Sequence, residues 1–241
     1  MRLQFSPTTF SRLAVLAFVA SASSASAQDI FVTPIPGAPF SGVVNVERSS
    51  VQPDGSIVTL KSIRDIGRDS RGRIRNERRE LVPVSSTKAP QVVTIHLYDP
   101  QTRLSTMLDP RARTFWTMTV NRPPETVPPA LLASPAGNNL PSNDFTKSED
   151  LGIHEIEGLA AHGVREIQTI PAENGNKQVV ITDEYWYSEE LRINLRIKHS
   201  DPRTGAVTLT VGQVMRTEPE PAFFEIPEGY KLASAGAGTD Q

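Results

Sequence analysis

The sequence predicts an all-β fold of antiparallel strands joined by hairpins, with few or no helices after an amino-terminal leader. Three observations favour this fold. Apolar residues alternate with polar ones along 191–198, as in a strand with one buried face. The turn residues 201–205 then lead into a second alternating run, 207–211, which completes a β-hairpin. After the leader, no window keeps helical apolar spacing over the roughly 11 residues of a typical helix.

The first 27 residues have the features of a secretory signal peptide. Arg2 and Arg12 supply positive charge, 13–20 is a short apolar run, and Ala25-Ser26-Ala27 is a small-residue cleavage site. Because the apolar run is too short to span a bilayer, we expect cleavage after Ala27 and export to the periplasm, without a transmembrane segment. The chain contains no cysteine, so we expect neither a disulfide nor a lipid anchor.

The charge balance argues against a nucleic-acid-binding protein. Of the 25 Lys and Arg residues, two lie in the leader, which leaves 23 against 27 Asp and Glu. A nucleic-acid-binding domain instead carries an excess of clustered positive charge. We therefore expect no nucleic-acid partner.

Between residues 28 and 120 the sequence predicts an arm followed by six strands. Residues 28–40 contain three prolines and predict an extended arm. Asp54-Gly55 and Ser70-Arg71-Gly72 suit tight turns, and Asp99-Pro100 and Asp109-Pro110 begin two more. The predicted strands are 41–51, 56–66, 73–84, 91–99, 103–108 and 113–120.

Residues 121–144 interrupt this rhythm with six prolines and predict a crossing loop, either a lid or a linker. Further strands are predicted at 145–153, 156–160 and 163–170, followed by a turn at Asn174-Gly175 and an aromatic strand from 184. We expect one β domain over 41–232, in halves 41–120 and 145–232. Residues 233–241 are expected to be a disordered tail.

The carboxy-terminal segment carries a resemblance to a known superfamily. Residues 184–188 (EYWYS) begin a Trp-bearing strand, and 224–231 (FEIPEGYK) close the pattern with Phe, Pro and Gly-Tyr-Lys. This pattern resembles the lipoprotein-carrier superfamily of bacterial envelopes, which includes the outer-membrane lipoprotein chaperone. More narrowly, the chain is similar to uncharacterised exported proteins of acidobacteria, through 149–152, 156–158, 170–172 and 200–203.

The resemblance implies a strongly bent antiparallel sheet, a half-open barrel in meander order, whose concave apolar face holds acyl chains or a partner protein beneath lid helices. Here Pro-rich segments stand where those helices are expected. Either a non-helical loop covers the face or the lipid-carrying activity is absent. We expect a non-enzymatic periplasmic protein that binds a lipid-like or other apolar ligand in the concave face. The alternative is an envelope interaction or stress-sensing module without a small-molecule ligand.

Arginines gather between residues 64 and 79, where acidic residues interrupt them. One hypothesis is a site for an anionic headgroup or an acidic partner, because Arg forks match phosphate and carboxylate. It predicts that Arg73, Arg75 and Arg78 contribute to binding. The other hypothesis is a solvated hairpin whose charges discourage strand addition.

Two dense aromatic spots also suggest a ligand groove, at Trp116 and at Tyr185 and Trp186. Core packing is the alternative, and we expect it for at least one of the two tryptophans.

The sequence offers no chemistry beyond binding. The four histidines are scattered and match no zinc spacing, so we expect no metal site and no cofactor. The motif Gly-x-Ser-x-Gly and phosphate-binding Gly loops are absent from the sequence. Adjacent carboxylates such as Asp183 and Glu184 point to opposite faces of a strand and cannot act as a glycosidase pair.

Overall fold

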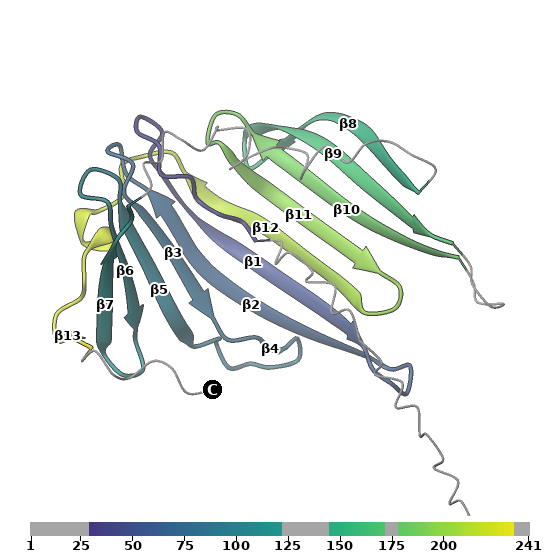
Figure 1. Ribbon diagram of the computed structural model, residues 1–241, viewed down its shortest axis with the longest axis horizontal. Coiled ribbons are helices and arrows are strands. Elements are labelled where there is room, and N and C mark those ends of the chain that lie inside the picture. Colours follow the sequence, from purple (N-terminus) through teal and green to yellow (C-terminus); the bar gives the residue numbers. More distant parts are fainter. Residues whose placement is uncertain (1–28, 122–144, 172–177, 234–241) are drawn as a thin grey trace, which may run out of the picture.

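The computed structural model describes residues 29–121, 145–171 and 178–233. These ranges form one bent, open sheet of thirteen strands with a single short 3-10 helix (Figure 1). The predicted all-β, bent and largely antiparallel fold is confirmed. The expected leader, the crossing loop after Asn121, the Asn174-Gly175 turn and the tail after Ala233 lie outside the described residues.

The bounds of the elements follow the predicted strands closely over most of the chain. The strands are β1 (Phe40–Val51), β2 (Ile57–Arg68), β3 (Ile74–Arg79), β4 (Val82–Pro83), β5 (Val92–Asp99), β6 (Leu104–Asp109), β7 (Thr114–Thr119), β8 (Thr146–Ile156), β9 (Leu159–Ile170), β10 (Val179–Ser188), β11 (Ile193–Asp201), β12 (Gly205–Met215) and β13 (Lys231–Leu232), with the 3-10 helix η2 (Pro221–Phe224) before β13.

The strand order runs β13-β7-β6-β5-β3-β2-β1-β12-β11-β10-β9-β8, with β4 paired to β2. The first strand therefore lies between its hairpin partner β2 and the late strand β12, so it joins the early strands to the late ones (Figure 1). Neighbouring strands are antiparallel, except that β13 runs parallel to β7. The meander is thus interrupted twice, where β1 meets β12 and where β13 meets β7.

The three Asp-Pro turns share one hydrogen-bond geometry, as their common chemistry predicts. In each turn the aspartate Oδ1 accepts the main-chain N–H of the residue two positions later. The distances are 2.8 Å for Asp99, 2.9 Å for Asp109 and 2.9 Å for Asp201. Such side-chain bonds stabilise a turn locally, before any strand pairing is considered.

Two predicted strand boundaries are wrong. The three strands expected over 145–170 are two long strands, β8 and β9, because Glu157-Gly158 forms the turn with φ of 53° and 72°. Gly163, which the prediction placed at a strand start, lies inside β9. The strand expected over 73–84 is divided into β3 and the two-residue β4, which pairs with β2 rather than β5.

The main core lies on one side of the sheet, which we call the Val44 face. Paired residues of neighbouring strands share a face, so the registers assign each side chain. The central apolar residues of this face are each at most 2% exposed: Phe40, Val44, Ile66, Ile74, Ile193, Leu195, Ile197, Leu209 and Val211. The alternation predicted along 191–198 is therefore confirmed, with Ile193, Leu195 and Ile197 buried.

The opposite side, the Ile95 face, holds a smaller core and a polar centre. Ile95, Leu97 and Leu108 are buried there, with Phe115 and Tyr230 packed against them. The chain after β12 covers this core, since β13 pairs with β7 and η2 contacts β3. This face therefore buries its apolar residues beneath a segment of the same chain.

A row of alternating charge crosses the Ile95 face in register. Its members pair strand by strand from β8 to β2: Glu149, Arg165, Glu184, Lys198, Thr208, Glu47 and Lys61. Glu184 lies 3.0 Å from Arg165 and 3.2 Å from Lys198. Opposite charges directly across a strand pair stabilise that register. This row makes the middle of the Ile95 face polar, in contrast to the Val44 face.

Candidate functional site

The Val44 face continues beyond its buried centre into an exposed apolar region on β6 and β7. We call Met107, Trp116 and Met118 the Trp116 wing. One registered row runs from Ile66 through Asn76, His96 and Met107 to Trp116. Ile66 is 1% exposed, whereas Trp116 and Met118 are 47% and 52% exposed. The Val44 face thus passes from a closed apolar core, across the polar side chains of Asn76 and His96, to an open apolar surface.

Polar groups border the Trp116 wing. The His96 Nε2 lies 2.9 Å from Ser105 Oγ, and burial lowers the pKa of His96, so the ring is neutral near pH 7. The Asn76 Nδ2 is buried without a hydrogen-bond partner among the described residues. Within the described ranges no carboxylate bonds to His96, so the His96–Ser105 pair lacks the orienting third group of a hydrolytic triad.

The centre of the Val44 face is covered by the irregular arm that precedes β1. Ile30 and Val32 are 3% and 0% exposed and belong to the same core as Val44. The sequence predicts an open apolar hollow here. The structure instead fills the centre with arm side chains and leaves the Trp116 wing exposed at one end, because an uncovered apolar sheet face of this size would be unfavourable in water.

Arg68 holds the arm in place without a carboxylate partner. Its guanidinium is fully buried and donates to three main-chain oxygens: Ala38 at 2.8 Å, Thr33 at 2.8 Å and Leu191 at 2.9 Å. Burial lowers the pKa of Arg68 to about 10. The side chain nevertheless stays charged at pH 7 and bonds the arm to the chain just before β11.

Two hollows on the described surface have linings that mix polar and apolar groups. The smaller, of about 70 Å³, lies between β8, β9 and β10 and is lined by Thr146, Ser148, Glu166 and Asp183 among others. The larger is an open groove of about 600 Å³ on the Ile95 face. It lies between the loop 86–90 and the sheet around Thr208. The larger groove exposes more apolar than polar surface but is open to solvent, so neither hollow is an enclosed apolar cavity that would surround an acyl chain.

The smaller hollow contains an unusual carboxylate. Glu166 lies directly across from Asp183, which in turn is 2.8 Å from the His199 Nδ1. Burial, together with the neighbouring Asp183 carboxylate, raises the pKa of Glu166 to about 7. No group of three or more potential metal ligands occurs in the described part of the chain. Glu166 is therefore a carboxyl group of the sheet that can gain or lose its proton near neutral pH.

The predicted aromatic residues separate onto different faces. Trp116 and Tyr185 both lie on the Val44 face, but at opposite ends of the sheet, on β7 and β10. Trp186 is buried on the other side, against His154, with its Nε1 donating to Glu184 at 2.7 Å. Trp186 is thus the tryptophan that the sequence analysis expects in the core. The three residues do not form one groove.

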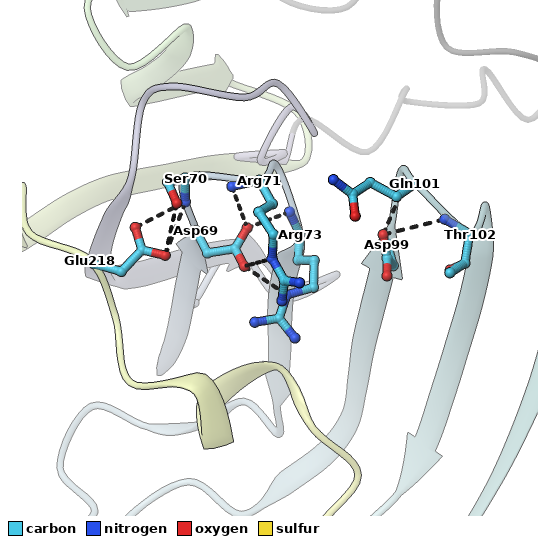
Figure 2. Close-up of polar contacts among 8 residues, drawn as sticks. All are labelled: Asp69, Ser70, Arg71, Arg73, Asp99, Gln101, Thr102 and Glu218. Atoms are coloured by element: carbon cyan, nitrogen blue, oxygen red, sulfur yellow. Dashed lines mark hydrogen bonds and ion pairs between the residues drawn. The ribbon is translucent and has the colours of Figure 1, made fainter.

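The predicted arginines separate as well. The Arg73 Nε donates to Asp69 at 2.6 Å, in the β2–β3 turn that also binds Glu218 through Ser70 (Figure 2). Arg73 and Arg75 also stack on Phe224 and Phe223, at 5.1 Å and 4.9 Å. These two arginines therefore bind the chain's own carboxy-terminal segment.

Arg78 alone of the three lies on the Val44 face. It is exposed and makes no ion pair with the described residues. Arg64 and Arg68 belong to the same arginine-rich stretch but are not among its predicted binding residues; they lie on the same face as Arg78 and contact the arm. Their even spacing with Ile66 was the available signal, because residues two apart in a strand share a face. The arginines that the registers place on the Val44 face of β1, β2 and β3 are therefore Arg48, Arg64, Arg68 and Arg78.

No helix in the described ranges has the length and apolar character of a membrane span. No family model and no curated protein match the sequence.

Solved structures with a similar arrangement of strands are known. The lipoprotein LppX from Mycobacterium tuberculosis is 13% identical, with a TM-score of 0.31 over 74% of this chain and 88% of that chain. A LolA superfamily protein from Nitrosomonas europaea is 10% identical, with a TM-score of 0.31 over 80% and 92%. LprF from Mycobacterium bovis is 14% identical, with a TM-score of 0.30 over 77% and 90%.

One of these neighbours is named as a LolA superfamily protein. The narrower likeness to acidobacterial proteins has no support among them. At TM-scores of 0.30 and 0.31 the likeness does not extend to function, which has to be inferred from the residues of the site.

Proposed function

We propose that this protein binds an apolar, lipid-like ligand on the Val44 face, without catalysis, in the periplasm. One observation carries the proposal: the apolar face that forms the core remains half-exposed at Trp116 and Met118. Contiguous exposed apolar surface on a soluble domain marks binding sites. An alkyl chain laid along this surface would gain about 0.8 kcal/mol for each methylene removed from water.

The arm supports the proposal. Of the first four described residues of the arm, two are buried in the core, Ile30 and Val32. The other two, Asp29 and Phe31, are exposed. A short irregular segment held by few side chains is easier to displace than a strand held by a full ladder. A ligand that begins at the Trp116 wing would therefore extend beneath the arm.

The polar residues of the site support a function without catalysis, and the predicted leader supports a periplasmic location. The polar groups of the Trp116 wing comprise a neutral histidine, a serine and an amide, which suit recognition more than bond cleavage. The export signal predicted in residues 1–27 supports a periplasmic location.

A neutral fluorophore tests the proposal. We would titrate the purified full chain with N-phenyl-1-naphthylamine, whose emission rises in apolar surroundings, and extract the same preparation for mass spectrometry of bound lipid. Trp116→Ala and Met118→Ala should each weaken binding about fivefold, as loss of about 1 kcal/mol of contact predicts. Leu104→Ala, an exposed apolar residue on the Ile95 face, is the matched control. Equal binding by all four proteins, or none by the wild type, would contradict the proposal.

A second candidate function is recognition of another envelope protein by strand addition. One observation favours it: β8 is at one end of the sheet and pairs only with β9 among the described strands. The edge carries charges and a bulge between Asp150 and Gly152, features that discourage strand addition. We therefore rank it second. A bound strand would protect the amides of β8 from hydrogen exchange, and their unchanged exchange in an envelope extract would argue against it.

A further inference from the structure

The first residues of the arm lie on the Val44 face as an acidic group followed by apolar side chains. Asp29 binds the Arg64 guanidinium through both carboxylate oxygens, with Nη1 donating to Oδ2 at 2.9 Å and Nη2 donating to Oδ1. Ile30 and Val32 then enter the core. Arg64 itself lies directly across from Val44 on the neighbouring strand. The arm thus presents a carboxylate to an arginine and aliphatic groups to the adjacent core.

Arg64 has the properties of a receptor for an anion. Its side chain is only 12% exposed, and its Nε is buried without a partner among the described residues. Asp29 is the one acidic residue within ion-pair distance of it in the described part of the chain, and that carboxylate is 48% exposed. Two parallel N–H···O bonds to a carboxylate or phosphate are the strongest geometry available to a guanidinium. A partly buried arginine that lost Asp29 would therefore favour another anion in its place.

The surroundings of Arg64 strengthen this preference. Arg48, Arg68 and Arg78 lie on the same face of β1, β2 and β3, and none of them forms an ion pair with a described carboxylate. The acids that the registers place on the Val44 face of β9, β10 and β11 are Glu166, Asp183 and Asp201, and Asp201 is already paired with Arg203. The field around Arg64 is therefore positive, and Asp29 neutralises only part of it.

The arm is attached in a way that lets its first residues move separately. Thr33 is fixed by two bonds, from Arg68 to its main-chain oxygen and from its own hydroxyl to the Arg192 oxygen at 3.2 Å. Among the described residues before Thr33, the Asp29–Arg64 ion pair is the one polar contact that attaches the arm to the sheet. Cleavage after Ala27, which the sequence predicts, would leave Asp29 second in the exported chain. Residues 29–32 could then leave the face while 33–39 stay bound.

We propose that the ligand is an anionic amphiphile and that Asp29–Val32 is its internal stand-in, with the ligand's carboxylate or phosphate replacing Asp29 at Arg64 and its chain replacing Ile30 and Val32. This inference rests on the proposed function and specifies the ligand class. The alternative explanation of the same contacts is an arm that stays bound to the sheet permanently. It predicts no preference between anionic and neutral chains.

The experiment compares matched twelve-carbon compounds, dodecanoate, dodecyl phosphate and dodecanol, each below its micelle concentration, and inorganic phosphate alone. Binding to the full chain is measured by displacement of N-phenyl-1-naphthylamine and by calorimetry. The variants are Arg64→Gln and Asp29→Asn. Arg196→Gln, which removes the same charge from the Ile95 face, is the matched control.

The wild type should bind both anionic chains about tenfold more tightly than dodecanol, as about 1.4 kcal/mol from charge-assisted bonds predicts. Arg64→Gln should reduce that ratio to within about twofold, whereas Arg196→Gln should leave it unchanged. Asp29→Asn should tighten the binding of all three chains about fivefold, because less has to be displaced. Dodecanoate should also increase hydrogen exchange at Ile30 and Val32.

The possible failures can be told apart. If dodecanol and the anionic chains bind equally to the wild type, the anionic class is wrong and the proposed function stands. If inorganic phosphate binds as tightly as dodecyl phosphate, Arg64 is a simple anion site and the stand-in role of the arm is wrong. If no chain binds to the wild type or to Asp29→Asn, both proposals fall.

Discussion

The Arg68 guanidinium donates a 2.9 Å hydrogen bond to the main-chain oxygen of Leu191, which lies 123 residues later in the chain. The same side chain bonds Thr33 and Ala38 of the arm. One buried cation therefore connects the arm, the early strand β2 and the residues before the late strand β11. Since its three partners are neutral carbonyls, the charge is stabilised by hydrogen bonds rather than by an opposite charge.

Arg68→Gln should destabilise the protein by about 3–5 kcal/mol, because three buried oxygens lose their donors and a cavity forms. The measurement is the free energy of unfolding from urea titration followed by tryptophan fluorescence. Arg192→Gln, an exposed neighbour, should change stability by less than about 0.5 kcal/mol. A similar small change in both variants would show that the Arg68 bonds do not hold the arm.

Glu166 predicts a pH dependence with a definite sign. Its pKa is raised to about 7, so the folded state holds the proton more tightly than the unfolded state. The stability from this group is present below its ordinary pKa of about 4.5 and is lost as pH rises through about 7. Urea midpoints at pH 5, 6, 7 and 8 should therefore fall more steeply for the wild type than for Glu166→Gln.

The difference between the two proteins isolates Glu166 from other titrating groups. One of these is His96, whose lowered pKa acts in the opposite direction. Parallel pH profiles for the wild type and Glu166→Gln would contradict the assignment.

Gly163 should not tolerate a side chain. A Cβ there would lie 2.6–2.8 Å from the Trp186 ring, which is itself buried. We expect Gly163→Ala to cost about 1–3 kcal/mol through displacement of the indole, with a changed near-ultraviolet circular dichroism. Gly212→Ala is the matched control on the same side of the sheet, since its Cβ would meet its nearest neighbour at 3.5 Å. Equal costs would mean that Trp186 does not pack on Gly163.

Substitution of Arg75 and of Arg78 should affect stability differently, although the two residues are only three positions apart. Arg75 stacks on Phe223, donates to its main-chain oxygen at 3.2 Å and pairs with Glu77. Arg75→Ser should therefore lower the free energy of unfolding by about 1–3 kcal/mol and increase hydrogen exchange over η2. Arg78→Ser should leave stability within about 0.5 kcal/mol. If Arg78→Ser alone lost stability, the assignment of Arg75 to the covered face and of Arg78 to the exposed one would be wrong.

The strands and turns were predictable because their signals are local. The alternation along 191–198 places Ile193, Leu195 and Ile197 on one buried side, as observed. The Asp-Pro turns form as predicted because each aspartate bonds to its own main chain. The errors at 145–170 are local too, since Gly158 and Gly163 look alike in sequence, although one is in a turn with positive φ and the other lies beneath Trp186.

The candidate site was predictable only in part. Trp116 and Arg78 lie on the Val44 face, but Arg73, Arg75 and Trp186 belong to other contacts. Strand periodicity already separates Tyr185 from Trp186, and Arg75 from Arg78, onto opposite faces. Residues that are close together in a strand sequence therefore need not lie close together in space.

The sequence by itself determined the all-β class, the positions of most strands and the chemistry of the turns, because a period of two and bonds between near neighbours act within a few residues. The tertiary structure decided that β1 lies between β2 and β12, and that the arm covers one face and the carboxy-terminal segment the other. Those choices join residues more than a hundred positions apart. They depend on the free energy of burying whole faces, which no local pattern encodes.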